Sequence, residues 1–402
     1  MPANKITLPG EPSIACYYCG QCKVKSEFSD EHIWPDALGG DFLEQFWRTN
    51  HVCTKCNSMS GVFVDGAFIR GWAGSTERGY DAHQYLSQTE PLRSILPLNY
   101  LGRLNDPNID ADEIADWWVG PCGAIIVHFR PKEVESIWSS YVGGDPRSKK
   151  TQAGRAYIAL VSEEEYWIVA ALGSFRQHFK RAQRFVVNTT VPPEWTAFEE
   201  VDRNDLAQAA DLKVFDGITD AAKAGKNTHA RQQIQIDAGH RFMCKIGLAI
   251  GCKIFGVSFG CHLHGDQLRR AFREANLERR KKIPIRGSGY FSEPAQNPLA
   301  LFAWPAGWVL MIQVLEGTLS LTVITPSGKF MTVIITDDPK LIAVLPAEYK
   351  DGIVWITVPP LAKAAGPISM PEYVAHITRS ILHPELSAFE AARIDPATLP
   401  PC

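Results

Sequence analysis

Two cysteine pairs, Cys16-Tyr-Tyr-Cys19 and Cys53-Thr-Lys-Cys56, decide how the first part of this chain can fold. Two thiolates separated by two residues can both reach one tetrahedral zinc ion, and two such pairs complete a closed four-thiolate structural site. A short, turn-rich segment needs such a site because it buries too little apolar surface to fold by itself. We therefore predict one structural Zn²⁺ held by Cys16, Cys19, Cys53 and Cys56.

The loop between the cysteine pairs carries the sequence SDEHIWPDALGG at 29–40, and Asn57 directly follows the last cysteine. Histidine is the side chain whose ordinary pKa lies near neutrality, so His32 suits a general base. Glu31 and Asn57 offer hard oxygen ligands of the kind that Mg²⁺ and Mn²⁺ prefer. A base and a divalent cation are what the hydrolysis of a phosphodiester bond requires.

The complete pattern is C-x-x-C, then E-H-I-x-P-x-x-L-G-G, then V-C-x-x-C-N-x-x-x-G. It resembles the zinc-stapled form of the HNH endonuclease family over residues 14–65. The resemblance implies a ββα-metal unit, in which a hairpin carries Glu31 and His32 and the following helix carries Asn57. It also implies that His32 is the general base, and that Glu31 and Asn57 hold a catalytic Mg²⁺ or Mn²⁺.

This chain departs from the family pattern at two positions. The last metal ligand is usually a histidine, where this chain has Asn57. The middle residue of the pattern is usually an asparagine, but the alignment falls on Arg48, so nearby Asn50 is the candidate for that role. An alternative interpretation is a catalytically degenerate zinc-containing protein that binds nucleic acid or regulates other proteins.

The charge distribution indicates where nucleic acid could bind. The net charge of the 402 residues is −3, so positive charge must be concentrated locally. Residues 266–286 hold eight basic and three acidic side chains. Arg269, Arg273 and Arg280 fall near one helical face, and we predict that they contact the phosphates of a nucleic acid, with DNA as the expected substrate. A solvated helix face is the alternative.

The rest of the chain predicts an α+β fold that ends in an antiparallel β meander. Apolar runs rich in β-branched and aromatic residues predict strands at 123–129, 156–161 and 166–172. Periodic apolar positions predict helices at 237–255 and 266–281. Five further strand-like runs between Gly, Pro and Asp turns predict the meander, at 299–305, 307–315, 317–325, 328–336 and 352–358.

The sequence predicts four regions that follow one another along the chain. We expect an HNH-like module at 1–75, a connecting segment at 76–110, a mixed α+β domain at 111–285, and a β-rich region with a helical tail at 286–402. The first residues contain no apolar stretch of signal-peptide length, and no window approaches the length of a membrane span. We therefore expect a cytoplasmic protein with no membrane partner, in which reduced thiols are available to bind metal.

Overall fold

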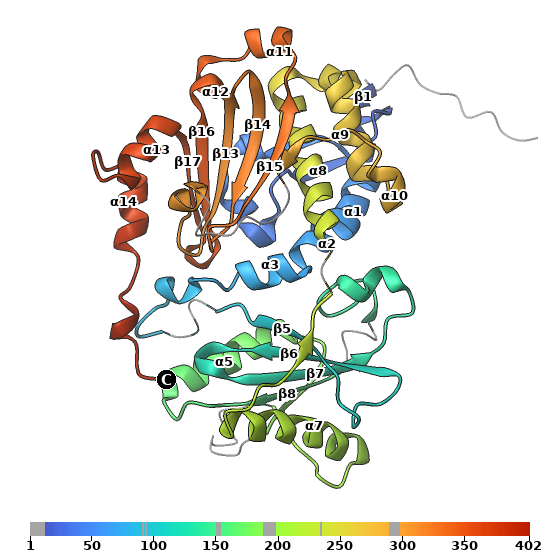
Figure 1. Cartoon of the computed structure of the whole chain (residues 1–402), viewed down its shortest axis with the longest axis vertical. Helices are drawn as coiled ribbons and strands as arrows, with labels where there is room; N and C mark the ends of the chain where they lie inside the picture. The colour runs from blue at the N-terminus through green and yellow to red at the C-terminus, as the bar shows by residue number, and fades with distance from the viewer. Residues whose placement is uncertain are drawn as a thin grey trace, which may run out of the picture. The chain divides into compact units, whose positions relative to one another are not determined.

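The computed structural model describes residues 13–90, 92, 95–149, 154–187, 198–233, 235–288 and 298–402 (Figure 1). The chain forms two compact units, and neither is continuous in sequence. Unit 1 comprises Met1–Gly66 and Ile236–Leu386, and unit 2 comprises Ala67–Gln235 and Ser387–Cys402. This arrangement differs from the serial division expected from the sequence, because residues 236–285 belong to the same unit as the N-terminal module.

Unit 1 is built around a six-stranded antiparallel sheet with the order β12-β15-β14-β13-β16-β17 (Figure 1). The predicted meander is confirmed for β13, β14 and β15, whereas β16 pairs with the other edge of β13. The strands are β12 (Gly287–Ser288), β13 (Trp308–Leu315), β14 (Thr318–Ile324), β15 (Phe330–Thr336), β16 (Ile353–Val358) and β17 (Lys363–Ser369).

The strand predicted at 299–305 is wrong, since Pro298–Phe302 forms a short 3-10 helix. This run holds alanine and leucine in place of the β-branched residues that favour strands. Helices α11 (Pro339–Ala343) and α12 (Ala347–Asp351) lie between β15 and β16 in the chain, α13 (Met370–Ile377) follows β17, and α14 (Pro384–Ala391) spans the change from unit 1 to unit 2.

Helix α8 (Ile236–Phe255) confirms the predicted helix and packs against this sheet. Its apolar stripe is buried at Phe242, Ile246 and Ile250. Gly247 allows a close approach, because a Cβ atom there would lie 3.1 Å from Cγ1 of Val333 in β15. The helix thus forms a rigid support between the sheet and the N-terminal module.

The single helix predicted at 266–281 is wrong in its continuity, because the structure has α9 (Leu263–Arg273) and α10 (Leu277–Arg280). The backbone leaves the helical region at Glu274. Asn276 then caps α10 by accepting a 3.0 Å hydrogen bond from the backbone N–H of Arg279. An N-cap residue favours a new helix over the continuation of the old one.

Unit 2 contains a seven-stranded mixed sheet with the order β10-β9-β8-β7-β6-β5-β11. Strands β8, β9 and β10 run parallel and the other pairs are antiparallel. The strands are β5 (Asn99–Leu104), β6 (Glu113–Val119), β7 (Ile125–Pro131), β8 (Arg155–Ala159), β9 (Gln183–Val186), β10 (Glu199–Glu200) and β11 (Ala230–Arg231). The strands predicted at 123–129 and 156–161 are confirmed as β7 and β8.

Helices α5 (Glu165–His178) and α7 (Leu206–Lys223) cover the two faces of this sheet (Figure 1). The side chain of Phe175 in α5 shares one core with Ile126, and that of Phe215 in α7 shares another with Val127. Ile126 and Val127 are neighbours in β7, so their side chains point to opposite faces of the sheet. Both faces of the sheet are therefore buried.

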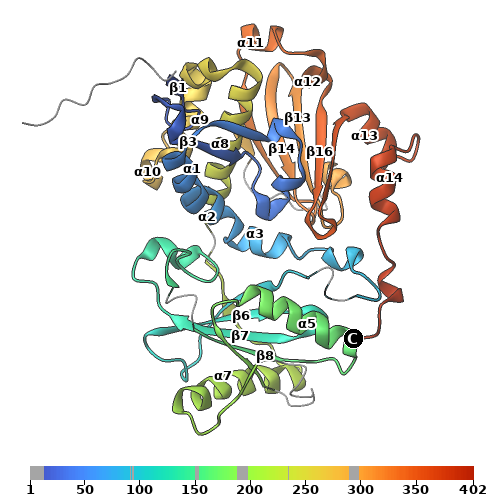
Figure 2. The ribbon, with the colours of Figure 1, turned by 180° about the vertical axis from the view of Figure 1, so that it is seen from behind.

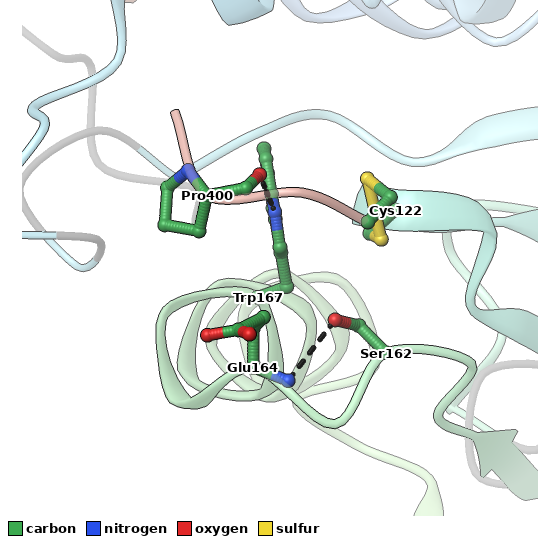
Figure 3. The surroundings of a disulfide bond; sticks show 6 residues. Cys122, Ser162, Glu164, Trp167 and Pro400 are labelled. Atoms are coloured by element: carbon green, nitrogen blue, oxygen red, sulfur yellow. Dashed lines mark hydrogen bonds between the residues drawn. A yellow bond between two sulfur atoms is a disulfide. The ribbon is translucent and has the colours of Figure 1, made fainter. Parts of the chain in front are cut away.

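The strand predicted at 166–172 is wrong, because these residues lie in α5. Periodicity alone does not distinguish a short, continuous apolar run in a strand from one in a buried helix. Ser162 accepts a hydrogen bond from the backbone N–H of Glu164 just before the helix (Figure 3). In the first turn of the helix, Trp167 donates to the carbonyl of Pro400, and nearby Cys122 forms a disulfide with Cys402. The C-terminal segment is thereby held in unit 2.

Helices α2 (Gly66–Ile69) and α3 (Trp72–Glu77) follow the N-terminal module in the chain and lead into unit 2. Among the described residues, none of the helices combines the length and the apolar character that crossing a bilayer would require.

Candidate active site and metal centres

The first cysteine pair lies in the tight turn that joins β1 (Ser13–Ala15) to β2 (Cys22–Val24) in a small hairpin. The backbone N–H of Gly20 donates to the carbonyl of Cys16 at 2.8 Å, which turns the chain around the metal position. Gly20 has φ +73°, a left-handed conformation that glycine adopts without strain.

The second pair lies where strand β4 (Arg48–Cys53) passes into helix α1 (Thr54–Ser60). Sulfur atoms of Cys16, Cys19, Cys53 and Cys56 all lie within 4.8 Å of one another, which confirms the predicted cysteine cluster. A hydrogen bond with Cys56 holds the pKa of the Cys16 thiol at about 4, well below its usual range. Four convergent sulfurs with one already favouring the thiolate form are the donor set of a structural Zn²⁺.

The segment between the pairs forms a hairpin of β3 (Phe28–His32) and β4, followed by α1 (Figure 2). His32 pairs with Arg48, and Glu31 pairs with Thr49. A bulge lies between Ser29 and Glu31 in this ladder. Two strands and a helix around a metal position are the ββα arrangement expected from the resemblance.

Glu31 points into the interior of unit 1 and is only 4% exposed. Its Oε1 accepts a hydrogen bond from the hydroxyl of Tyr18 at 2.9 Å and lies 2.7 Å from Nζ of Lys245 in α8. Nζ of Lys245 also donates to Asp65 at 2.6 Å. Burial raises the pKa of Asp65 to about 6, although the charge of Lys245 opposes this shift. Glu31 is therefore part of a buried charge cluster, and a metal ion could bind Glu31 only by displacing Lys245.

His32 points the other way, toward a half-exposed surface, where two carboxylates flank its ring. Nδ1 lies 2.9 Å from Oδ1 of Asp36, and Nε2 lies 3.3 Å from Oδ1 of Asp41. Ligand atoms of His32, Asp36 and Asp41 lie within 4.8 Å of one another, close enough to share one cation. Burial, together with the nearby Asp41 carboxylate, raises the pKa of Asp36, while His32 opposes the shift.

The Leu38-Gly39-Gly40 turn brings Asp41 back to His32. Gly39 has φ +94°, which glycine accommodates without strain. Gly40 leaves no room for a side chain, because a Cβ atom would lie 1.9 Å from the carbonyl oxygen of Trp34. The hydroxyl of Thr357 in β16 donates to the carbonyl of Leu38 at 2.7 Å. The sheet of unit 1 therefore fixes a loop that belongs to the nuclease-like module.

Asn57 fastens the helix to the hairpin. Its Nδ2 donates to Oγ of Ser29 at 3.1 Å and to the carbonyl of Asp30 at 2.9 Å. Asn50, the candidate for the middle residue of the family pattern, is exposed on β4. Arg48 reaches the site itself, with Nη2 donating to Oδ1 of Asp41 at 3.1 Å. The structure thus brings Arg48 to His32 and Asp41.

The three arginines predicted to contact nucleic acid are engaged within the protein. Arg269 donates to the backbone carbonyl of Tyr17, and Arg273 donates to that of Tyr18 at 3.2 Å and to Sγ of Cys56 at 3.7 Å. Arg280 is 8% exposed and pairs with Asp237. Arg269 and Arg273 thus hold the zinc knuckle against α9, and contact of the three arginines with nucleic acid stays a prediction.

Sequence reasoning missed Asp36, Asp41 and the Lys245 cluster. Asp36 lies four residues after His32 in sequence, within a P-D-A turn, and this spacing was the available signal for their proximity. Asp41 directly follows the Gly-Gly pair that closes the loop. Lys245 gave no local signal, because only the fold brings α8 to β3.

Residues 16–73 match the family model described as HNH endonuclease. The match spans the zinc cluster, the β3–β4 hairpin and α1, and it ends in α3. Neither a curated protein nor a solved structure matches the chain. Helices α8 and α9, the sheet of unit 1 and nearly all of unit 2 lie outside the matched residues.

Proposed function

We propose, from the match of residues 16–73 to the HNH endonuclease family, that this module is a metal-dependent endonuclease that hydrolyses phosphodiester bonds, with DNA as the substrate. The observation that carries the proposal is the His32 ring, with its side chain 22% exposed, held between the exposed carboxylates of Asp36 and Asp41. An imidazole beside two carboxylates supplies both a base and hard oxygen donors for a divalent cation.

His32 is the general base in this proposal. The Asp36 carboxylate accepts the Nδ1 proton, which orients the ring and leaves the Nε2 lone pair free to act. A water molecule gives a proton to Nε2 while its oxygen bonds to phosphorus. The phosphorus–oxygen bond to the leaving sugar breaks, and the leaving oxygen takes a proton from solvent.

Asp36 and Asp41 are the residues that would hold Mg²⁺ or Mn²⁺ beside His32. Such a cation would stabilise the charge that develops on the phosphate during hydrolysis. The ligand roles expected for Glu31 and Asn57 fit less well, since Glu31 is paired with Lys245 and Asn57 is bonded to β3. We propose instead that these two residues position the hairpin that carries His32.

Cleavage assays on single-site variants test these roles. The purified protein is assayed on plasmid DNA, single-stranded DNA and RNA with Mg²⁺, with Mn²⁺ and with EDTA. His32→Ala should lower the cleavage rate by roughly a hundred- to ten-thousand-fold, and added cation should not restore it. Asp41→Asn should weaken binding of the cation and lower the cleavage rate, and a raised Mn²⁺ concentration should partly restore it.

His229→Ala is the matched control, because His229 is an exposed histidine of unit 2 and should leave the rate unchanged. Full cleavage by His32→Ala would overturn the assignment. If the parent protein binds DNA but cuts none of the substrates with either cation, the catalytically degenerate alternative is correct.

A further inference from the structure

Unit 2 contains a cavity of about 570 Å³. Its lining includes Trp118 and His128 from the sheet, Ser174 and Gln177 from α5, and Ser75 from α3. Its volume is in the range of small-molecule sites, which is roughly 300–1,000 Å³. None of the described residues that line it is acidic, whereas four are arginine or lysine: Arg70, Arg78, Lys180 and Arg181.

Arg70 and Arg78 are the unusual members of this lining. Both are partly buried, and neither guanidinium forms a hydrogen bond or an ion pair with any residue in the described part of the chain. Burial lowers the pKa of each, and the charge of Arg70 lowers the pKa of Arg78 further. Two neighbouring, partly buried cations that find no counter-charge among the described residues are costly to a folded protein unless an anion compensates them.

Two neutral polar side chains lining the same cavity are also left unsatisfied. His128 is 3% exposed, and neither of its ring nitrogens has a hydrogen-bond partner within the described residues. Burial lowers the pKa of His128 to about 4, so the ring is neutral at pH 7 and offers one N–H donor. Oγ of Ser174, which is 2% exposed, likewise has no partner among the residues described. Buried polar atoms are nearly always paired, so these atoms indicate an absent binding partner.

Part of the cavity lining is apolar and aromatic. Trp118 and Phe179 line it and lie 6.1 Å apart between ring centroids in an edge-on arrangement. Ile69 and Leu98 add apolar surface to the lining. A site with a cationic end, a few buried polar atoms and an aromatic wall suits a ligand that has both an anionic group and a ring or apolar body.

We propose that this cavity binds a small phosphate-bearing molecule, with Arg70 and Arg78 on its phosphate oxygens, His128 and Ser174 as neutral hydrogen-bond partners, and Trp118 and Phe179 against its apolar part. Phosphate is favoured over a single carboxylate because its several charged oxygens match two guanidinium groups. This site is separate from the His32 site and does not depend on whether the module cuts nucleic acid.

Calorimetric titration of the full chain with inorganic pyrophosphate and with AMP tests the proposal. We expect saturable binding, with AMP gaining from the aromatic wall. Arg70→Ala and Arg78→Ala should each weaken pyrophosphate binding by at least about tenfold, the effect of losing a hydrogen bond to a charged group. Arg176→Ala is the matched control, because this exposed arginine lies on α5 outside the lining and should bind as the parent does.

A stability measurement separates binding from folding. Arg78→Met removes an uncompensated buried cation, so without ligand its melting temperature should equal or exceed that of the parent. With 5 mM pyrophosphate, only the parent should gain stability. The absence of binding by pyrophosphate and AMP to the parent would overturn the proposal. Binding of a DNA oligonucleotide through Arg70 and Arg78 without binding of pyrophosphate would equally overturn it, in favour of a nucleic-acid surface.

Discussion

Glu31 and His32 are consecutive residues of strand β3, and their side chains lie on opposite faces of the β3–β4 hairpin. Glu31 meets Lys245 at 2.7 Å in the interior, whereas His32 meets Asp36 at 2.9 Å near the surface. Alternation along a strand makes this outcome unavoidable, since successive side chains point to opposite faces. The E-H pair therefore joins a buried anchor, Glu31, to His32, the base of the proposed mechanism.

The Lys245 anchor should be essential to the stability of unit 1. Lys245→Met leaves two buried carboxylates without their counter-charge, and removing one partner of a buried pair costs about 3–5 kcal/mol. We expect unit 1 of this variant to unfold at a lower urea concentration than in the parent, as monitored by tryptophan fluorescence. Lys281→Met, which removes a mostly exposed lysine, is the control and should unfold as the parent does. Equal stability of the two variants would show that the cluster contributes little.

Asp65 should make stability depend on pH in mildly acidic solution. Burial raises its folded pKa from 3.8 to about 6. Because the pKa of Asp65 is raised in the folded state, its contribution to the free energy of unfolding is fully present below about pH 4. This contribution is lost as the pH rises toward 6, because the buried carboxyl must then ionise. Relative to Asp65→Asn, the parent should lose stability across this window, which denaturant titrations at pH 4, 5, 6 and 7 would measure. A constant difference between the two proteins over this range would contradict the assignment.

Arg273 should slow the loss of zinc. Its guanidinium donates to the carbonyl of Tyr18 and to Sγ of Cys56, so it offsets negative charge on the thiolate cluster. Arg273→Ala should release zinc several-fold faster to a colorimetric chelator. Arg270→Ala is the matched control on the same helix, because the side chain of Arg270 is 63% exposed and forms a long ion pair with Asp266 at 3.9 Å. Identical release rates from both variants would mean that the contact with Cys56 is without effect.

Zinc itself should determine whether the N-terminal module folds. Elemental analysis should give about one zinc per chain, the stoichiometry of a closed four-thiolate site. Replacement of Cys53 and Cys56 by serine should unfold the module while unit 2 keeps its structure. Limited proteolysis checks this, with new cleavage expected before about residue 60. Cys261→Ser, at an exposed free cysteine, should leave the zinc content unchanged.

The sequence alone determined the zinc cluster, the ββα module and the identity of His32 as the candidate base. These features depend on residues close together in the chain, where spacing fixes geometry. It also determined α8 and the strands β13–β15, because their apolar patterns extend over enough residues to distinguish helix from strand. The strand expected at 166–172 failed because a short apolar run fits a buried helix as well as a strand.

Only the tertiary structure decided what surrounds His32 and what the predicted basic face does. Lys245 and Thr357 reach the module from segments far along the chain, so no local pattern could indicate that they fix Glu31 and the Leu38 carbonyl. Arg269 and Arg273 have the same charge whether they face solvent or the zinc knuckle, and only packing shows that they face the knuckle. Side-chain partners distant in sequence are set by how the elements pack, which is why they could not be predicted from spacing.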